Sequence, residues 1–209
     1  MNTPTDFQGA VGVTPQGLKD FTRRIATAFD NGEIRHPVHL SDGNEERLVA
    51  LFESIREQDW VFCSWRSHHQ CLLKGVPANR LEADIRYGKS IALCYPEHRI
   101  VSSAIVGGVL PIALGAALAI KRRQSDERVW CFLGDMAAET GSFHECHKYS
   151  VAWDLPVMWV VEDNKKSVCT PTAEVWNAQA LNRDWMPKVM RYEVHSVYPH
   201  AGAGKRVQF

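Results

Sequence analysis

Residues 129–164 read VWCFLGDMAAETGSFHECHKYSVAWDLPVMWVVEDN. Two apolar runs of strand length, 129–133 and 157–161, lie on either side of a helical segment that begins near Ser142. Ser142 and Glu145 stand three residues apart, which is the spacing of a capping box at a helix start. Strand, helix and strand in this order predict a βαβ unit with parallel strands and a right-handed crossover. Both apolar runs are continuous rather than alternating, so we expect an α/β fold whose parallel sheet has helices on both faces, in three layers.

Polar residues follow each of the two predicted strands. Asp135 comes after the first strand and Asn164 after the second. Because ligands bind beyond the carboxyl ends of parallel strands, we expect these two side chains to converge. Carboxylate and amide oxygens suit Mg²⁺, and the helix start near Gly141 and Ser142 adds backbone donors for phosphate. The pattern predicts a magnesium–diphosphate site, although Asp and Asn after strands are also common turn residues without any ligand.

Apolar spacing and turn residues predict the remaining elements. The aromatic- and histidine-rich stretch 59–70 is expected to be a loop, and 192–209 is expected to supply one more strand. Helices are expected at 14–32, 48–55, 78–87 and 111–122.

The composition is that of a globular protein with a core. The chain has 209 residues, of which 45% are apolar and 23% charged, and this balance excludes disorder as the main state. Lys and Arg together number 24, as do Asp and Glu, so no basic excess points to a nucleic-acid partner. We expect a single domain over 1–209, with 1–14 as a flexible N-terminal arm.

The distribution of cysteines and the hydropathy of the chain indicate its cellular location. Six cysteines are scattered without a CxxC pair, and the polar start of the chain shows no signal peptide, so we expect reduced thiols and a cytoplasmic location. Residues 100–120 carry no charge and precede Lys121, Arg122 and Arg123, a pattern that also fits a membrane helix. Because Pro111 and several glycines interrupt this segment, we expect that the chain does not associate with a membrane. We expect a loop followed by a buried small-residue helix at a subunit interface.

Four motifs, in order along the chain, carry a resemblance. The stretch GDMAAETGSFHE at 134–145, followed by EDN at 162–164, resembles the thiamine diphosphate motif of the alpha subunit of 2-oxo acid dehydrogenases, of the pyruvate and acetoin dehydrogenase type. These proteins share the transketolase-like fold. The other three motifs are HLSDGNE at 39–45, WRSH at 65–68 with LKGVP at 73–77, and AIVGGVLP at 104–111. The resemblance covers roughly residues 15–170 and implies the thiamine diphosphate-binding fold.

The resemblance implies thiamine diphosphate and Mg²⁺ as cofactors. Asp135 and Asn164 would hold the metal through side-chain oxygens, and Lys166 through its backbone carbonyl. Arg66 would clamp the diphosphate, which suits the guanidinium fork. Backbone groups of Ala104 and Val106 would meet the aminopyrimidine. The complete set of cofactor-binding residues that it implies is Trp65, Arg66, Ala104, Val106, Gly134, Asp135, Met136, Ala137, Asn164 and Lys166.

The sequence also departs from the pattern of that family. Met136 replaces the second Gly of the Gly-Asp-Gly motif, and its backbone cannot freely take a positive φ. Asp163 replaces the first Asn of the pair, Trp65 replaces a Tyr, and Ala92 stands where a His is frequent. His68 and His200 are the candidate catalytic residues, His200 through a weak match to the family's His-bearing loop.

The resemblance implies an alpha-like subunit of a two-component enzyme. Such an enzyme cleaves a 2-oxo acid or a ketose and transfers the two-carbon unit to a carrier protein, a lipoyl group or an aldehyde. A beta-like subunit would supply the catalytic Glu in an α2β2 assembly, and a lipoyl domain or an acyl carrier protein is a further candidate partner. The alternatives are the N-terminal half of a split transketolase and a non-catalytic scaffold subunit of the same fold.

Two other groups of residues have less weight. His144 and His147 share one face of the predicted helix with Cys146 nearby, a zinc-like grouping that lacks a fourth ligand at the usual spacing. The glycine-rich stretch 202–206 lacks the length and the following helix of a P-loop.

Overall fold

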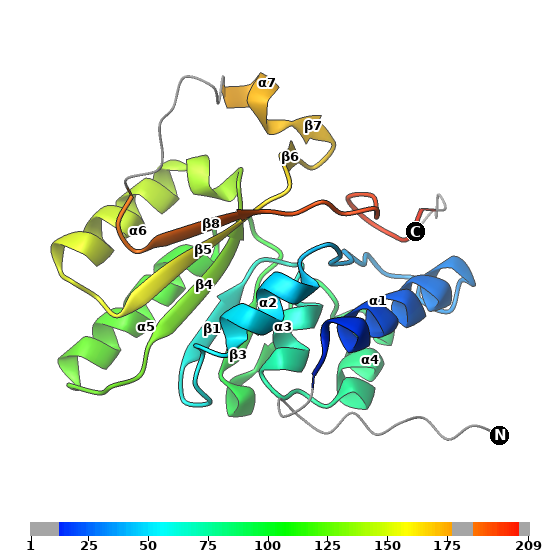
Figure 1. Cartoon of the computed structure of the whole chain (residues 1–209), viewed down its shortest axis with the longest axis horizontal. Coiled ribbons are helices and arrows are strands. Elements are labelled where there is room, and N and C mark those ends of the chain that lie inside the picture. Colours follow the sequence, from blue (N-terminus) through cyan, green and yellow to red (C-terminus); the bar gives the residue numbers. More distant parts are fainter. Residues whose placement is uncertain (1–12, 177–185, 205–209) are drawn as a thin grey trace.

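The computed structural model describes residues 13–176 and 186–204. Its central element is a six-stranded sheet of order β2-β3-β1-β4-β5-β8, in which every neighbouring pair is parallel except the edge pair β2–β3 (Figure 1). The predicted α/β fold is therefore confirmed. The strands are β1 (Trp60–Cys63), β2 (Cys94–Tyr95), β3 (Ile100–Ser102), β4 (Val129–Gly134), β5 (Val157–Asp163) and β8 (Val189–Glu193).

Helices cover both faces of the sheet. Alternate strand side chains divide between two apolar cores: Phe132 packs with α1 to α4 on one face, and Cys131 and Leu133 pack with α5 and α6 on the other. Figure 1 shows the same three layers. The helices are α1 (Pro15–Asp30), α2 (Glu45–Phe52), α3 (His68–Leu73), α4 (Ala78–Arg86), α5 (Val109–Arg122) and α6 (Gly141–Ala152).

The βαβ unit forms as predicted, but its helix begins earlier. Thr140 is the N-cap of α6, and its side chain accepts a hydrogen bond from the Phe143 N–H at 3.2 Å. A short 3-10 turn, η2 (Ala137–Glu139), separates β4 from this cap. The predicted capping box is therefore wrong, because Ser142 already lies inside the first turn and a hydroxyl two residues earlier satisfies the free N–H.

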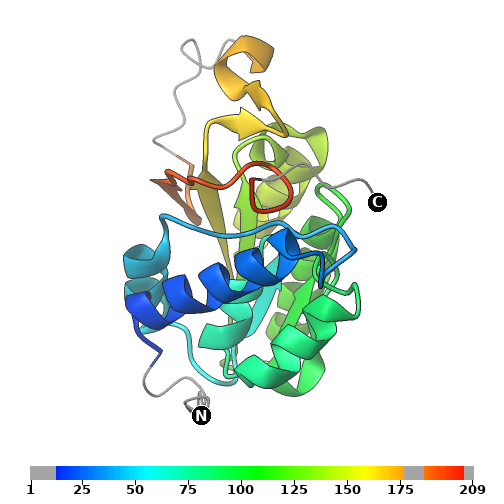
Figure 2. The ribbon, with the colours of Figure 1, turned by 90° about the vertical axis from the view of Figure 1, so that its right-hand side faces the viewer.

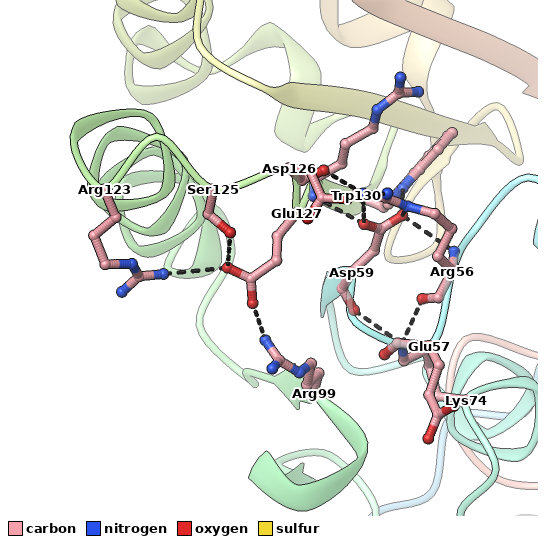
Figure 3. A network of polar contacts seen from close by, with 11 residues as sticks. Arg56, Glu57, Asp59, Lys74, Arg99, Arg123, Ser125, Asp126, Glu127 and Trp130 are labelled. Atoms are coloured by element: carbon pink, nitrogen blue, oxygen red, sulfur yellow. Dashed lines mark hydrogen bonds and ion pairs between the residues drawn. The ribbon is translucent and has the colours of Figure 1, made fainter.

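The predicted loop at 59–70 is also wrong, because it contains the central strand β1 and the start of α3. Asp59, which is fully buried, fixes the start of this strand (Figure 3). Its carboxylate accepts hydrogen bonds from the Arg56 side chain at 2.9 Å and from the Arg128 N–H at 2.9 Å, and a longer one from the Trp130 indole. A buried, fully paired carboxylate thus joins the amino ends of β1 and β4, away from the ends where ligands bind.

Two further elements differ from their predicted positions. The additional strand, β8, lies at Val189–Glu193 and so overlaps only the start of the stretch 192–209. Helix α5 begins at Val109, and it is buried on one face only, since Ile112 remains 54% exposed. Among the described residues, no helix combines the length and the apolar character that a membrane crossing requires.

The two ends of the described chain differ in their packing. Residues 1–12, most of the predicted N-terminal arm, lie outside the described residues, whereas Val13 is buried and Thr14 caps α1. After β8, residues 194–204, which we call the strap, return toward the loop that follows α1, and His39 pairs with Gly202 in a parallel bridge. Figure 2 shows the strap in red beside this loop, above α1.

Candidate functional site

A pocket of about 330 Å³ opens at the carboxyl ends of β1, β4 and β5. The segments that follow these three strands form one side of it, and the strap with the loop 40–44 forms another. Ten of the residues that we predicted for the site line this pocket: Trp65, Arg66, Val106, Gly134, Asp135, Met136, Ala137, Asn164, Lys166 and His200. His68 and Ala104 do not line it.

Asp135 is the first residue after β4 and is only 1% exposed. Its Oδ2 accepts a hydrogen bond from the Thr172 hydroxyl at 2.5 Å, whereas its buried Oδ1 has no hydrogen-bond partner among the described residues. Burial raises the pKa of this carboxyl. Since a buried oxygen without a partner is costly, Oδ1 marks a place where a cation fits.

Asn164 follows β5 and reaches the same edge of the sheet. Its Oδ1 accepts a hydrogen bond from the Lys166 N–H at 3.1 Å, and Lys165 between them has a φ of 56°. The chain then forms the hairpin β6 (Lys166–Ser167) and β7 (Thr170–Pro171) and enters α7 (Thr172–Trp176). This hairpin returns Thr172 to Asp135, and the three predicted metal ligands, Asp135, Asn164 and Lys166, all line the pocket.

Arg66 and Trp65 follow β1 and enter the pocket from the neighbouring strand. The Arg66 guanidinium donates to the carbonyl of Leu40 at 2.8 Å and to that of His200 at 2.9 Å. Burial lowers the pKa of Arg66. The Trp65 ring lies 5.8 Å from the ring of His39 and 6.3 Å from that of His200, so three aromatic rings cluster at this side of the pocket.

The structure separates the two candidate catalytic histidines. His200 lines the pocket, where burial and the nearby Arg66 lower its pKa. His68 is buried in α3 outside the pocket, and its Nε2 hydrogen-bonds with the Ser90 hydroxyl at 2.9 Å. Burial lowers the pKa of His68 to about 4. Only His200 therefore has access to a molecule in the pocket.

The turn after β4 explains one departure from the family pattern. Met136 has a φ of −67° and a ψ of −36°, an ordinary right-handed conformation that a side chain tolerates. Met136 and Ala137 line the pocket, whereas Gly141 and Ser142 at the start of α6 do not. Of the two places where we expected backbone donors for phosphate, the turn at Met136 and Ala137 lines the pocket and the helix start at Gly141 and Ser142 does not.

Asp163 is the second departure from the family pattern, and its carboxylate is paired within the chain. Its Oδ2 accepts hydrogen bonds from two nitrogens of Arg191 in β8, at 2.7 and 3.0 Å, and its Oδ1 accepts one from the Lys165 N–H. Asp163 does not line the pocket. Its carboxylate is thus neutralised from the neighbouring strand and is not presented to a ligand.

Glu162 is a pocket residue that the sequence analysis missed. Its carboxylate accepts hydrogen bonds from the side chains of Asn44, Gln70 and Tyr192 at 2.9, 3.2 and 2.7 Å, and burial raises its pKa. The signal was present, because Glu162 belongs to the polar run 162–164 that follows the apolar part of the predicted strand. Of the strap residues that line the pocket, only His200 was predicted, through its match to the family's His-bearing loop.

The zinc-like grouping on α6 does not assemble. His147 hydrogen-bonds through Nε2 with the carbonyl of Pro187 at 2.8 Å. Over the ranges 13–176 and 186–204, no three His, Cys, Asp or Glu side chains stand close enough together to hold a metal ion. The set predicted for Mg²⁺ contains only one such side chain, Asp135, so this finding does not bear on it.

Comparison with known proteins agrees with the fold and the motifs. A family model described as "Dehydrogenase E1 component" matches residues 15–183. The alpha subunit of acetoin:2,6-dichlorophenolindophenol oxidoreductase from Bacillus subtilis is 30% identical over 165 residues, which is 74% of this chain and 49% of that protein. The corresponding subunit from Cupriavidus necator is 31% identical over 158 residues, or 70% of this chain and 47% of that protein.

The pyruvate dehydrogenase E1 component subunit alpha of Porphyra purpurea is 29% identical over 167 residues, which is 72% of this chain and 48% of that protein. The chain thus spans about half the length of the curated relatives it matches. The predicted resemblance to E1 alpha subunits is confirmed. With most of its length matched by the family model, this chain belongs to the dehydrogenase E1 component family.

Proposed function

We propose that this chain is the alpha-like subunit of a two-component thiamine diphosphate-dependent enzyme and holds the Mg²⁺ and diphosphate side of the cofactor. The observation that carries the proposal is the buried, unpartnered Oδ1 of Asp135 at the carboxyl edge of the sheet. Asn164 lines the same pocket, and Arg66 faces the pocket from β1. An anionic oxygen, an amide oxygen and a guanidinium around one pocket suit a metal–diphosphate group.

The residues present fit this group. Asp135 and Asn164 would bind Mg²⁺ through side-chain oxygens and Lys166 through its carbonyl, while Arg66 and the N–H groups of Met136 and Ala137 would meet the diphosphate. The two departures from the family pattern at Met136 and Asp163 are compatible with this fit. Met136 adopts a conformation that needs no glycine, and Arg191 neutralises Asp163. Gly134 and Trp65 would complete the diphosphate side. Val106 and Ala104, two residues before it, would meet the aminopyrimidine.

When bound, thiamine diphosphate supplies the carbanion and the electron sink for cleavage beside a carbonyl. The described residues of this chain bind and orient that group, and the pocket walls exclude water from it. Of the described histidines, His200 is the one that lines the pocket, and its ring could accept a proton there, since burial and the nearby Arg66 lower its pKa and so favour the neutral form. We propose a 2-oxo acid or a ketose as the donor and a carrier protein, a lipoyl group or an aldehyde as the acceptor.

The catalytic Glu is proposed to come from a beta-like subunit in an α2β2 assembly. Supporting this, α5 presents an apolar outer face that includes the exposed Ile112, next to the exposed Ile105 and Val106 at the pocket. Exposed apolar surface of this kind marks a protein contact. The face lies beside the pocket, where a partner could also reach the cofactor.

The test is the cofactor content of the gently isolated complex. Native mass spectrometry of the full chain with the subunit that copurifies is expected to show a heterotetramer carrying thiamine diphosphate and Mg²⁺. Asp135→Asn keeps the size of the side chain but removes its charge, and it is expected to abolish the bound metal and cofactor. Asp126→Asn is the matched control, since Asp126 is exposed and distant from the pocket.

Two results would contradict the proposal. If Asp135→Asn retains cofactor and activity, the metal site is vestigial and the chain is a scaffold subunit. If the complex cleaves ketose phosphates but no 2-oxo acid, the chain is half of a split transketolase. Dye reduction with pyruvate, acetoin or a ketose phosphate as the donor separates these cases.

A further inference from the structure

The strap is fixed to the loop 38–43 by specific contacts along its length. Near its end, the Gly202 N–H donates to the carbonyl of Val38 at 2.8 Å. In its middle, the Val197 N–H donates to Oδ2 of Asp42 at 3.0 Å. Val197 and Asp42 are 155 residues apart in the chain, so these contacts join distant segments. The strap is thus a built part of the fold.

Two glycines allow the strap to approach this closely. A Cβ on Gly43 would lie 2.3 Å from the carbonyl oxygen of His195, and one on Gly202 would lie 2.9 Å from the ring of Phe29. Both glycines also have a φ of +77°. No other residue fits at either position without displacing the strap.

The strap contacts the pocket through one carbonyl group in particular. The His200 oxygen accepts hydrogen bonds from Arg66 Nη2 at 2.9 Å and from His39 Nδ1 at 2.6 Å. The Leu40 carbonyl accepts from the other terminal nitrogen of Arg66 at 2.8 Å. Two carbonyls on different segments therefore fix the plane of the guanidinium. Of its five N–H donors, these two bonds use two, and the other three have no hydrogen-bond partner among the described residues.

The match to the family model ends at residue 183, so the strap lies beyond the matched residues. Yet the strap contributes a wall of the pocket through Val194, Ser196, Tyr198, Pro199 and His200. We propose that the strap is a positioning segment for the cofactor pocket, in which the His200 carbonyl holds the Arg66 guanidinium in the orientation that binds diphosphate. This inference rests on the proposed function. Its physical basis is preorganisation: a guanidinium already held in place loses less freedom when an anion binds.

Single substitutions can displace the strap without altering any pocket side chain. Gly43→Ala places a methyl group against the backbone of His195 in the strap. Gly202→Ala places one between the strap and the ring of Phe29. Gly32→Ala is the matched control, because Gly32 has a φ of +76° but nothing within 4 Å of the added Cβ. All three variants carry the same backbone strain, so a difference between them reports the steric displacement alone.

The experiment measures affinity and strap exposure on the full chain, isolated with any subunit that copurifies. Calorimetric titrations with inorganic diphosphate plus Mg²⁺, and with thiamine diphosphate plus Mg²⁺, give the affinities, and hydrogen exchange of residues 194–204 reports displacement. Both displacing variants are expected to exchange faster in the strap and to bind each ligand at least about tenfold more weakly than Gly32→Ala. Melting curves of the same samples are expected to show all three variants folded at the temperature of the titrations, so that the loss of affinity does not come from unfolding.

Two outcomes would overturn the inference and leave the proposed function intact. In one, the strap exchanges faster but the affinity for diphosphate stays at the control value. In the other, neither variant changes exchange or affinity, so the strap is not seated as described. If the wild-type chain itself binds neither ligand, the proposed function fails, and the comparison between variants is not needed to show it.

Discussion

Arg191 on β8 donates two hydrogen bonds to one carboxylate oxygen of Asp163 on the adjacent strand β5, at 2.7 and 3.0 Å. The two strands are parallel, and this pair lies near their carboxyl ends. The charge of Asp163 raises the pKa of Asp135 and that of Arg191 lowers it, with burial of Asp135 as the larger cause. The pair therefore allows a second carboxylate beside the proposed metal site without adding its full charge there.

Arg191→Gln is expected to lower the free energy of unfolding by about 1–2 kcal/mol, because it leaves the buried carboxylate of Asp163 short of donors. Adding Asp163→Asn should restore most of this loss. Urea denaturation followed by tryptophan fluorescence measures both. Arg23→Gln is the control, since Arg23 and Asp20 form an exposed pair that is expected to contribute little. Equal losses at the two arginines would show that the β5–β8 pair has no special role.

Asp59→Asn is expected to destabilise the chain by about 2 kcal/mol at pH 7, since an amide cannot accept all the hydrogen bonds that the carboxylate accepts. Burial opposes the charge on Asp59, but hydrogen bonds from Arg56 and two backbone N–H groups outweigh it and lower the pKa. The charged form therefore stabilises the fold above the ordinary pKa, and this contribution disappears as the pH falls below it. Unfolding curves between pH 7 and pH 3 should show the gap to wild type closing, and a gap that stays constant over this range would contradict the prediction.

The buried histidines predict lower stability in acid. Burial lowers the pKa to about 4 for His39 and His68 and to about 3 for His69, against an ordinary value of 6.5. Between pH 6.5 and 4 the unfolded chain takes up protons that the folded chain refuses, so stability should fall as the pH drops through this range. Melting temperatures measured from pH 7.5 to pH 4.5 test this. The slope should decrease in His68→Asn, because that variant lacks one of the buried imidazoles; a flat wild-type profile would contradict the prediction.

Met136→Gly restores the family's glycine but is expected to bring no benefit. The residue already has a negative φ, so glycine would only add freedom to the unfolded chain and cost about 0.5–1 kcal/mol of stability. Cofactor affinity should stay within about twofold of wild type. Calorimetric titration and urea denaturation of the same samples measure the two effects. A marked gain in affinity would show that Met136 obstructs the site and would favour the scaffold alternative.

The elements that were predictable share a local origin. The continuous apolar runs of β4 and β5 and the polar residues directly after them predicted parallel strands and a site at their carboxyl edge, because hydropathy and chain direction suffice for that inference. Ten of the twelve residues that we predicted for the site line one pocket, since most of them follow strands of the same sheet. Sequence motifs also placed the chain in its family.

What was not predictable depends on contacts between distant segments. Trp60 to Cys63 read as a loop because four residues carry little periodicity, and only their pairing with β3 and β4 makes them a central strand. Likewise, no local pattern shows that the strap returns to Gly43, or that His200 presents its carbonyl to Arg66 while His68 is buried elsewhere. Sequence patterns record which residues favour a strand, a helix or an edge. Which segments then approach each other closely depends on steric fit and hydrogen bonding in the folded chain, and here those contacts complete the pocket.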